Sequence, residues 1–202
     1  MFRHPYLTLI ATSVAIVGGQ SVLAQSFPAD TIRFVVGYPP GGSTDISARA
    51  IANYLSQNTD ANFIVENRAG GSGIVGASSV ANAEADGYTL LFAASPEVAL
   101  VEALDRQTDY DVEEDFRPIT LIGQVEYVLV GRAGLPASDL NELVAYAEKN
   151  PDTLSFASFG IGTSNHLAGE AFKSATNTDF LHVPYNGSAP GMVDLLGGRV
   201  DI

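Results

Sequence analysis

The sequence contains no cysteine, and only ten basic residues stand against 23 acidic ones in 202 positions. The absence of cysteine excludes disulfide bridges, thiolate chemistry and a lipid anchor on an N-terminal cysteine. The formal net charge of −13 argues against binding of nucleic acid or an anionic membrane by bulk electrostatic attraction. With 46% hydrophobic residues, the chain nevertheless has enough apolar material for one ordinary domain or two small ones.

Familiar motifs of catalysis and metal binding are also missing. The chain has no Gly-x-Ser-x-Gly turn for a serine nucleophile, no phosphate-binding Gly-Lys-Ser/Thr and no His-x-x-x-His pair. His166 lies in a helical pattern and His182 in an apolar strand-like run, where a polar contact or a packed core histidine is the simpler interpretation. The sequence therefore predicts no enzyme activity, no catalytic residue, no metal site and no cofactor.

One long apolar run stands at the start of the chain. Residues 7–19 are uncharged and mostly apolar, Arg3 precedes them, and small residues allow cleavage after Ala24. The run is shorter than the roughly 20 residues that a membrane span needs. We expect residues 1–24 to be a signal peptide of an exported, periplasmic protein. The mature chain would carry nine basic and 23 acidic residues, a net charge of −14.

The remaining sequence alternates strand-like and helix-like segments. Strands are expected at 31–38, 62–67, 86–95, 153–158 and 180–185, and helices at 44–57, 73–84, 97–104, 138–151, 164–176 and 189–198. In helix 44–57 the apolar spacing predicts that Ile46, Ala50, Ile51 and Leu55 are buried, and Ser138 is expected to cap the helix that follows it. This alternation predicts mostly parallel sheets flanked by helices.

The pattern changes at residues 109–132. An acidic stretch, 109–115, is expected to be a solvated loop, and two β-type runs follow with little helix between them. We therefore predict two lobes, lobe one from 25 to 121 and lobe two from 122 to 202. Residues 199–202 begin a further strand-like run after a Gly-Gly helix end, so we expect the chain to be truncated inside lobe two.

Two strand-to-helix turns carry the main functional signal. Loop one, residues 38–45, reads YPPGGSTD, and loop two, residues 158–164, reads SFGIGTS. The glycines allow close approach of a ligand to the backbone, and Ser43, Thr44, Thr163 or Ser164 could cap the following helices. A helix start offers free N–H groups and a partial positive charge, which suit a carboxylate or phosphate. Each turn could equally be a plain connection, but two of them facing across a cleft could hold one small anion.

A third glycine-rich stretch supports a different hypothesis. Residues 71–76 match Gly-x-Gly-x-x-Gly between a strand and a helix, which formally resembles a dinucleotide fingerprint. The alternative function is accordingly an exported dinucleotide-binding protein or enzyme that uses this loop. A second alternative is a sensor whose lobes contact another protein rather than a solute.

The order of the sequence blocks resembles one known family. The stretches YPPGGSTDISARAIANYL, VENRAGGSGIVGASSVANAEADGYTLLF, YDVEEDFRPITLIG and LSFASFGIGTSNHLAGEAF, with the rest of the chain after them, look like the tripartite tricarboxylate transporter receptors, also called Bug receptors. The resemblance runs from about residue 30 to the end. Members of this family continue beyond the point that corresponds to residue 202.

The resemblance implies an extracytoplasmic solute-binding receptor with the periplasmic-binding-protein type II fold. Two α/β lobes would close on a small carboxylate in the manner of a Venus flytrap and deliver it to the permease subunits of a tripartite tricarboxylate-type transporter. The protein would act without a cofactor, bind no nucleic acid and be a monomer.

The same resemblance assigns ligand contacts to the first βα loop of each lobe, with weaker candidates at Ser95 and at residues 185–186. The ligand-binding residues that it implies are Tyr38, Pro40, Gly41, Gly42, Ser43, Thr44, Asp45, Ser95, Ser158, Phe159, Gly160, Ile161, Gly162, Thr163, Ser164, His166, Tyr185 and Asn186. Asp45 has two possible roles, either stabilising the helix start or meeting a ligand amine or water.

Overall fold

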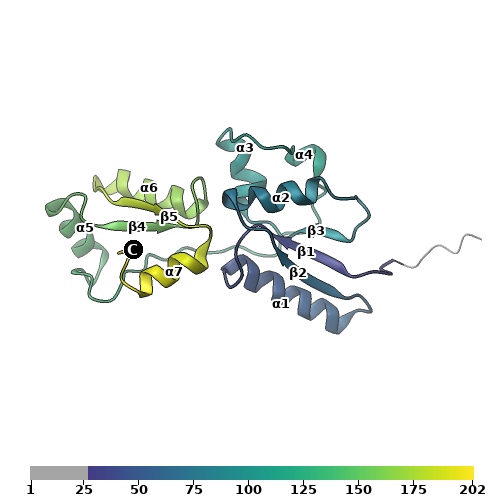
Figure 1. Ribbon diagram of the computed structural model, residues 1–202. Coiled ribbons are helices and arrows are strands. Elements are labelled where there is room, and N and C mark those ends of the chain that lie inside the picture. Colours follow the sequence, from purple (N-terminus) through teal and green to yellow (C-terminus); the bar gives the residue numbers. More distant parts are fainter. Residues whose placement is uncertain (1–26) are drawn as a thin grey trace, which may run out of the picture.

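The structure is a computed structural model that describes residues 27–202, so the predicted signal peptide lies outside the described residues. It consists of two α/β lobes joined side by side (Figure 1). In this part of the chain no helix has the length and apolar character required to cross a membrane. Lobe one contains the elements from β1 to α4 and lobe two those from α5 to α7. The boundary between residues 121 and 122 stays a prediction.

Lobe one is built on a three-stranded parallel sheet. Strands β1 (Ile32–Val36), β2 (Phe63–Asn67) and β3 (Thr89–Leu91) pair in the order β2-β1-β3. Helix α1 (Ser43–Asn58) covers one face, and α2 (Ile74–Ala81) lies on the other with the π-helical turn η2 (Pro96–Leu100) (Figure 1). Three short helical elements complete the lobe: η1 (Gly71–Gly73), α3 (Val101–Ala103) and α4 (Val112–Asp115).

The central strand β1 places loop one at the edge of the lobe. Its apolar residues Ile32 and Phe34 pack on Ala52 of α1, and Val35 on the opposite face is also buried. Because all three strands are parallel, their carboxyl ends and the loops that follow them lie at one edge of the sheet. That edge faces lobe two (Figure 1).

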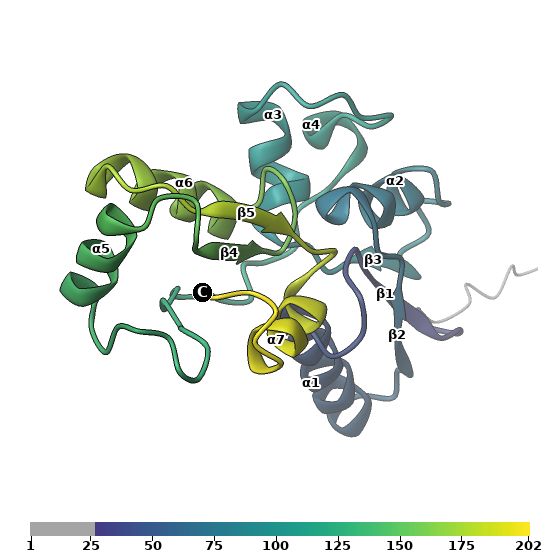
Figure 2. The ribbon, with the colours of Figure 1, turned by 60° about the vertical axis from the view of Figure 1, so that its left-hand side comes forward.

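Lobe two has a smaller sheet between helices. Strands β4 (Ser155–Ser158) and β5 (Leu181–Pro184) are parallel. Helices α6 (Ser164–Thr176) and α7 (Ser188–Leu196) lie on its two sides, and α5 (Leu140–Lys149) lies at the far end (Figure 2). Phe180 is 2% exposed in the core of this lobe, where it packs with Leu143 and Phe156.

Most of the predicted elements are present, and several local predictions were wrong. Ile46 is 60% exposed and Ala50 is also exposed, because α1 turns Ala48 and Ala52 to the sheet instead. Small residues let the helix approach the strands closely, and the larger Ile51 and Leu55 pack only partly buried at the margin of that contact.

The predicted caps also differ from the observed ones. Helix α5 is capped by Asp139, whose carboxylate accepts a 2.9 Å hydrogen bond from the Glu142 N–H, while Ser138 donates to the Glu142 carboxylate. The acidic stretch is not a simple loop either. Asp111 accepts hydrogen bonds from the N–H groups of Glu113 and Glu114 and so starts the one-turn helix α4.

The two β-type runs predicted within residues 119–131 form no strand. Their apolar side chains stay exposed, with Ile119 at 75%, Leu121 at 75% and Val128 at 82%. No strand among the described residues pairs with them, so their high β propensity is not enough to form a strand. The predicted strand at the end of the chain is not assigned either, although Ile202 exchanges backbone hydrogen bonds with Ser155 and Ala157 of β4.

Candidate functional site

Loop one is held in place by a buried carboxylate. Asp45 is 2% exposed and accepts hydrogen bonds from the Gly41 N–H at 2.9 Å, from Asn67 Nδ2 at 2.8 Å and from Arg49 Nε at 3.0 Å. Burial would raise the pKa of Asp45, but these bonds outweigh it and place that pKa below its ordinary value. Every recorded bond of this carboxylate serves the loop and its flanks, which favours the structural one of its two predicted roles.

The prediction that Ser43 or Thr44 caps α1 was wrong. Gly42 occupies the N-cap position in an extended conformation, and no side chain caps the helix. Gly41 has a φ of +82°, which a residue with a side chain rarely adopts, so the turn depends on that glycine. The first helical N–H, that of Ser43, donates instead to the Ser188 hydroxyl of lobe two at 3.1 Å.

Tyr38 belongs to the core of lobe one rather than to its surface. The side chain is buried, with its hydroxyl 2.9 Å from a Glu97 carboxylate oxygen and 3.1 Å from the Ser72 carbonyl oxygen. Burial raises the pKa of Glu97 to about 7, although hydrogen bonds from the Ala94 N–H and Tyr38 oppose this. A protonated Glu97 would donate to Tyr38, which leaves the single phenol proton free for Ser72.

Loop two is held by neutral groups. The Thr163 hydroxyl lies 2.6 Å from the Gly160 carbonyl, and Asn165 accepts from the Phe159 N–H at 3.3 Å. Thr163 occupies the N-cap position of α6, as one of the predicted alternatives had it, but its side chain makes no capping bond to the helix. Gly162, with a φ of +79°, completes the turn.

A serine and two histidines support the base of loop two. Ser158, which is fully buried at the end of β4, has its hydroxyl 2.6 Å from His182 Nε2 and 3.3 Å from the Gly160 nitrogen. The His166 and His182 rings are tilted by 35° with centroids 4.3 Å apart, and His166 Nδ1 accepts from the Gly162 N–H. Burial, followed by the neighbouring His166, lowers the pKa of His182. Through these hydrogen bonds Ser158 and His166 hold the backbone of loop two in place.

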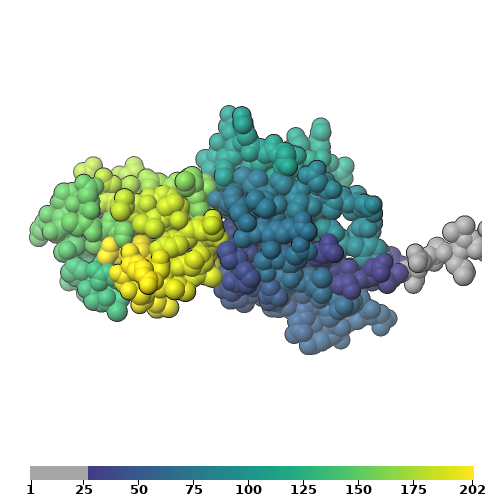
Figure 3. All heavy atoms as spheres, viewed as in Figure 1, coloured from purple at the N-terminus to yellow at the C-terminus, as the bar shows by residue number. Residues whose placement is uncertain are grey.

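The two loops contact opposite lobes through different partners rather than facing each other directly. Loop one contacts the start of α7 through the bond from Ser43 to Ser188. Loop two contacts lobe one through the Ile161 carbonyl, which accepts from the Ser72 hydroxyl at 2.9 Å and from Arg106 Nη1 at 3.2 Å. Figure 3 shows the two lobes in contact on one face, where the yellow part of lobe two meets the purple and blue part of lobe one.

Helices α1 and α6 both begin at this contact with backbone donors available. Within residues 27–202, the N–H groups of Thr44 and Asp45 in α1, and of Ser164 and Asn165 in α6, make no recorded hydrogen bond. These are the first-turn groups that have no partner within a helix. Two helix N-termini therefore present unpaired donors and partial positive charge at the contact between the lobes.

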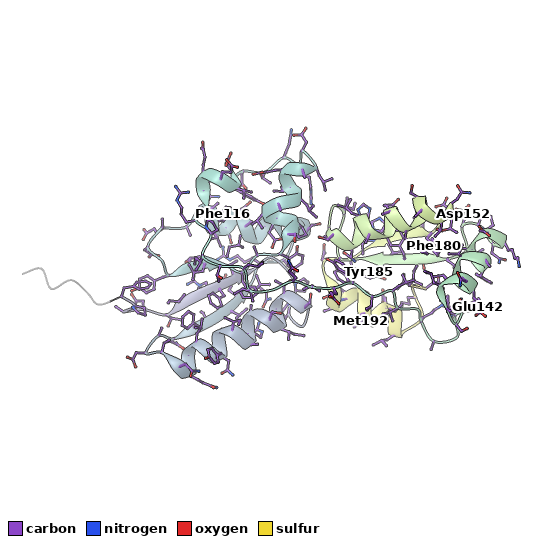
Figure 4. All side chains as sticks on the ribbon, turned by 180° about the vertical axis from the view of Figure 1, so that it is seen from behind. Phe116, Glu142, Asp152, Phe180, Tyr185 and Met192 are labelled. Carbon is purple, nitrogen blue, oxygen red and sulfur yellow. The ribbon has the colours of Figure 1, made fainter. Side chains whose placement is uncertain are left out.

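The weaker predicted positions lie at the margins of this region. Ser95, Pro40 and Asn186 are exposed, and no hydrogen bond of a Ser95 or Asn186 side chain is recorded within the described residues. Tyr185 lies on the side of lobe two near lobe one (Figure 4), but its hydroxyl donates to Asp194 of the same lobe at 2.9 Å. A pocket of about 480 Å³ lies between α5 and α6, far from both loops.

Comparison with known proteins gives a family for this architecture. The model of the tripartite tricarboxylate transporter family receptor matches residues 47–202. The chain belongs to this receptor family. Protein BugT of Bordetella pertussis is 38% identical over 96% of the chain and 60% of its own length. A protein from the tcbD-tcbE intergenic region of a Pseudomonas strain is 38% identical over 99% of the chain and 59% of its own length.

Solved structures agree with the fold. A periplasmic transporter structure superposes with a TM-score of 0.83 at 39% identity, covering 87% of this chain and 59% of that one. An R. palustris protein with adipate gives 0.78 at 36% identity, over 87% and 58%. MatC of Rhodopseudomonas palustris with bound malate gives 0.79 at 30% identity, over 87% and 60%. The chain spans about 60% of the length of the curated relatives that it matches.

In this receptor-family member the glycines of residues 71–76 serve packing. A Cβ on Gly76 would lie 2.6 Å from the Gly37 Cα, so the bare glycines let α2 approach the end of β1. A Cβ on Gly73 would lie 2.6 Å from the Glu97 carboxyl group. The space where a dinucleotide fingerprint receives a pyrophosphate is therefore filled by a buried acidic side chain, which argues against the dinucleotide hypothesis.

Sequence reasoning missed four residues at the site: Ser72, Glu97, Arg106 and Ser188. Ser72, Arg106 and Ser188 each form a hydrogen bond with a loop of the opposite lobe, and Glu97 forms one with Tyr38. For Arg106 a signal was available, since it is the only basic residue between Arg68 and Arg117. The two serines look like ordinary turn residues in the sequence.

Proposed function

We propose that the chain is the ligand-gripping part of a periplasmic receptor that captures a small carboxylate between its two lobes. The observation that carries this is the pair of helix N-termini, α1 and α6, which begin at the contact between the lobes with unpaired first-turn N–H groups. Such groups bind anions without needing a basic side chain. The family match and the relatives that contain adipate and malate support the same ligand class.

The binding energy also favours two loops over one. Micromolar affinity corresponds to about −8.2 kcal/mol. A hydrogen bond to a charged group contributes about 1.5–3 kcal/mol, and association costs remove part of the sum. Two or three bonds from one helix start fall short of that value, whereas donors from both lobes reach it. Because backbone dipoles act at contact range, a chain with a net charge of −13 can still hold an anion.

The proposal includes the finer points of the prediction. We propose that the signal peptide at 1–24 exports the protein and that its lobes run from 25 to 121 and from 122 to 202. The protein acts as a monomer and delivers its ligand to the permease subunits of a tripartite tricarboxylate-type transporter. The ligand contacts are those of loop one and loop two. The exposed positions Ser95 and Asn186 belong to the outer margin of the proposed site.

A proline substitution at the first position of α6 tests the proposal directly. Ser164→Pro removes one N–H that has no recorded partner within the protein, and Thr163 before it already has the extended conformation that proline requires. We expect the variant to fold normally and to lose at least tenfold in affinity for a dicarboxylate such as malate or adipate, measured by calorimetry on the full protein.

Leu140→Pro is the matched control, because it makes the same change at the first position of α5. This helix lies at the far end of lobe two, and the capped N–H there belongs to Glu142. The control should keep wild-type affinity. A folded wild-type protein that binds no member of a broad carboxylate panel, or a Ser164→Pro variant that binds as well as wild type, would contradict the proposal.

A further inference from the structure

Arg106 joins the two lobes between loop two and the glycine-rich stretch 71–76. The residue follows α3 and is half-buried. Its guanidinium group donates from Nη1 to the Ile161 carbonyl of loop two at 3.2 Å and from Nη2 to the Gly71 carbonyl of lobe one at 3.3 Å. It is thus the basic side chain that touches loop two from the opposite lobe.

Arg106 makes no close ion pair with a carboxylate of the described residues. Seven ion pairs within 4.0 Å are recorded in residues 27–202, and none of them includes Arg106. Its two acceptors are neutral carbonyl groups at long distances. This is unusual for its position, because residues 69–116 contain ten acidic residues and no other basic one. Arginine prefers the planar, bidentate pairing that a carboxylate offers.

The geometry of loop two brings this guanidinium close to the proposed ligand donors. Gly162 has no side chain, and a Cβ placed there would lie only 3.4 Å from Arg106 Nη1. Ser164 and Asn165, whose N–H groups are unpaired, follow directly after this turn. A linear diacid with one carboxylate on the start of α6 can therefore place its other carboxylate within reach of Arg106.

We propose that Arg106 recognises the second carboxylate of a dicarboxylate ligand and makes the receptor prefer diacids over monoacids. This inference rests on the proposed function. On binding, the guanidinium group exchanges one or both neutral carbonyl acceptors for a charged one, which strengthens its hydrogen bonds. The acidic side chains of Glu102 and Asp105, which share a pocket wall with Arg106, restrict the carboxylate to the side of loop two.

A simpler role for Arg106 would be a latch that only holds the lobes together. The two roles predict different affinities for two ligands that differ only in the second carboxylate. A latch contributes equally to any ligand that requires closure, whereas a carboxylate partner contributes only to ligands that carry the second charge. Adipate and its monomethyl ester are a suitable pair, because they share the same chain and differ by one carboxylate.

Calorimetric titration of the full protein with both compounds separates these roles. We expect wild type to bind adipate at least tenfold more tightly than the ester. Arg106→Gln should weaken adipate binding tenfold or more and ester binding less than twofold, and Arg106→Lys, which keeps the charge, should lie between wild type and Arg106→Gln. Arg117→Gln is the charge-matched control, since Arg117 donates only to carbonyls at the end of α4.

The outcomes distinguish this inference from the proposed function. Equal loss of adipate and ester binding in Arg106→Gln, or equal affinity of wild type for both, would overturn the role of Arg106 and leave carboxylate binding intact. A wild-type protein that binds neither compound nor any other carboxylate would overturn the proposed function and this inference with it. If Arg106→Gln folds poorly, Arg106→Lys takes its place: a preference for adipate over the ester that is weaker than that of wild type supports the role of Arg106, and an unchanged preference contradicts it.

Discussion

Loop one and loop two have the same strand-turn-helix form but are held by different chemistry. Loop one depends on an ionised, buried Asp45 that binds Arg49 and the loop backbone. Loop two depends on neutral hydroxyl, amide and imidazole groups, with Ser158 against His182 at its base. The same strand-turn-helix geometry can thus be built with or without a buried charge. The two lobes should therefore respond differently to mutation and to pH.

Loss of the charge at Asp45 should have the largest effect on stability. Asp45→Asn keeps the size of the side chain but turns an NH₂ group toward the donors at Gly41 and Arg49. The carboxylate is buried while its partner Arg49 is half-exposed, and the loss of two hydrogen bonds to a charged acceptor should lower the free energy of unfolding by about 4 kcal/mol. Urea denaturation measures the change, and Asn165→Ala in the neutral loop two should cost only about 1 kcal/mol. Similar losses in both variants would remove the contrast between the loops.

Lobe one should be stabilised at mildly acidic pH by Glu97. Its pKa in the folded protein is about 7, against an ordinary value of 4.5, so the folded state holds a proton that the unfolded state releases. This contribution is complete below pH 4.5 and is lost as the pH rises through 7, and a shift of this size corresponds to about 3 kcal/mol.

Glu97→Gln provides the comparison for this pH effect. The amide keeps an acceptor for the Ala94 N–H and a donor for Tyr38 but does not titrate. The difference in unfolding free energy between wild type and variant, measured from pH 4.5 to 8, should change by about 3 kcal/mol in favour of the variant. A constant difference would mean that Glu97 is ionised throughout.

Lobe two should respond to pH in the opposite direction through His182. Because the pKa of His182 lies below its ordinary value, its contribution is present above pH 6.5 and is lost as the pH falls through the folded-state pKa. Ser158→Ala removes the hydrogen bond to Nε2 and should cost about 1–2 kcal/mol at pH 8. His182→Gln should flatten the stability profile below pH 6.5, whereas a profile identical to that of wild type would contradict this assignment.

The contact between the lobes should contribute least to stability. Ser72→Ala removes the hydroxyl that donates to the Ile161 carbonyl, a bond near the surface. We expect a loss of less than about 1 kcal/mol, since water can replace the donor. Thermal melting of Ser72→Ala beside Ser188→Ala, which loses the acceptor for Ser43, would show whether either contact matters more than this.

Much of the fold could be predicted because it depends on local patterns. The β-rich run at β1 and the turn residues around Gly41 and Gly162 are signals carried by residues that are neighbours in the sequence. The strands, helices and both loops could therefore be predicted from them. The strand prediction that failed has a tertiary cause. Residues 119–131 have the composition of strands, but a strand needs a neighbour, and none among the described residues pairs with them.

The sequence by itself determined the alternation of strands and helices, the glycine turns and the family, because these depend on local spacing and composition. Only the tertiary structure decided what the polar residues do. It turned Asp45 into a support for its loop, paired Glu97 with Tyr38 at a distance of 59 positions, and brought Arg106 against Ile161 across the lobes. Such contacts join residues far apart in the chain, and their energies depend on burial and direction, which a linear pattern does not contain.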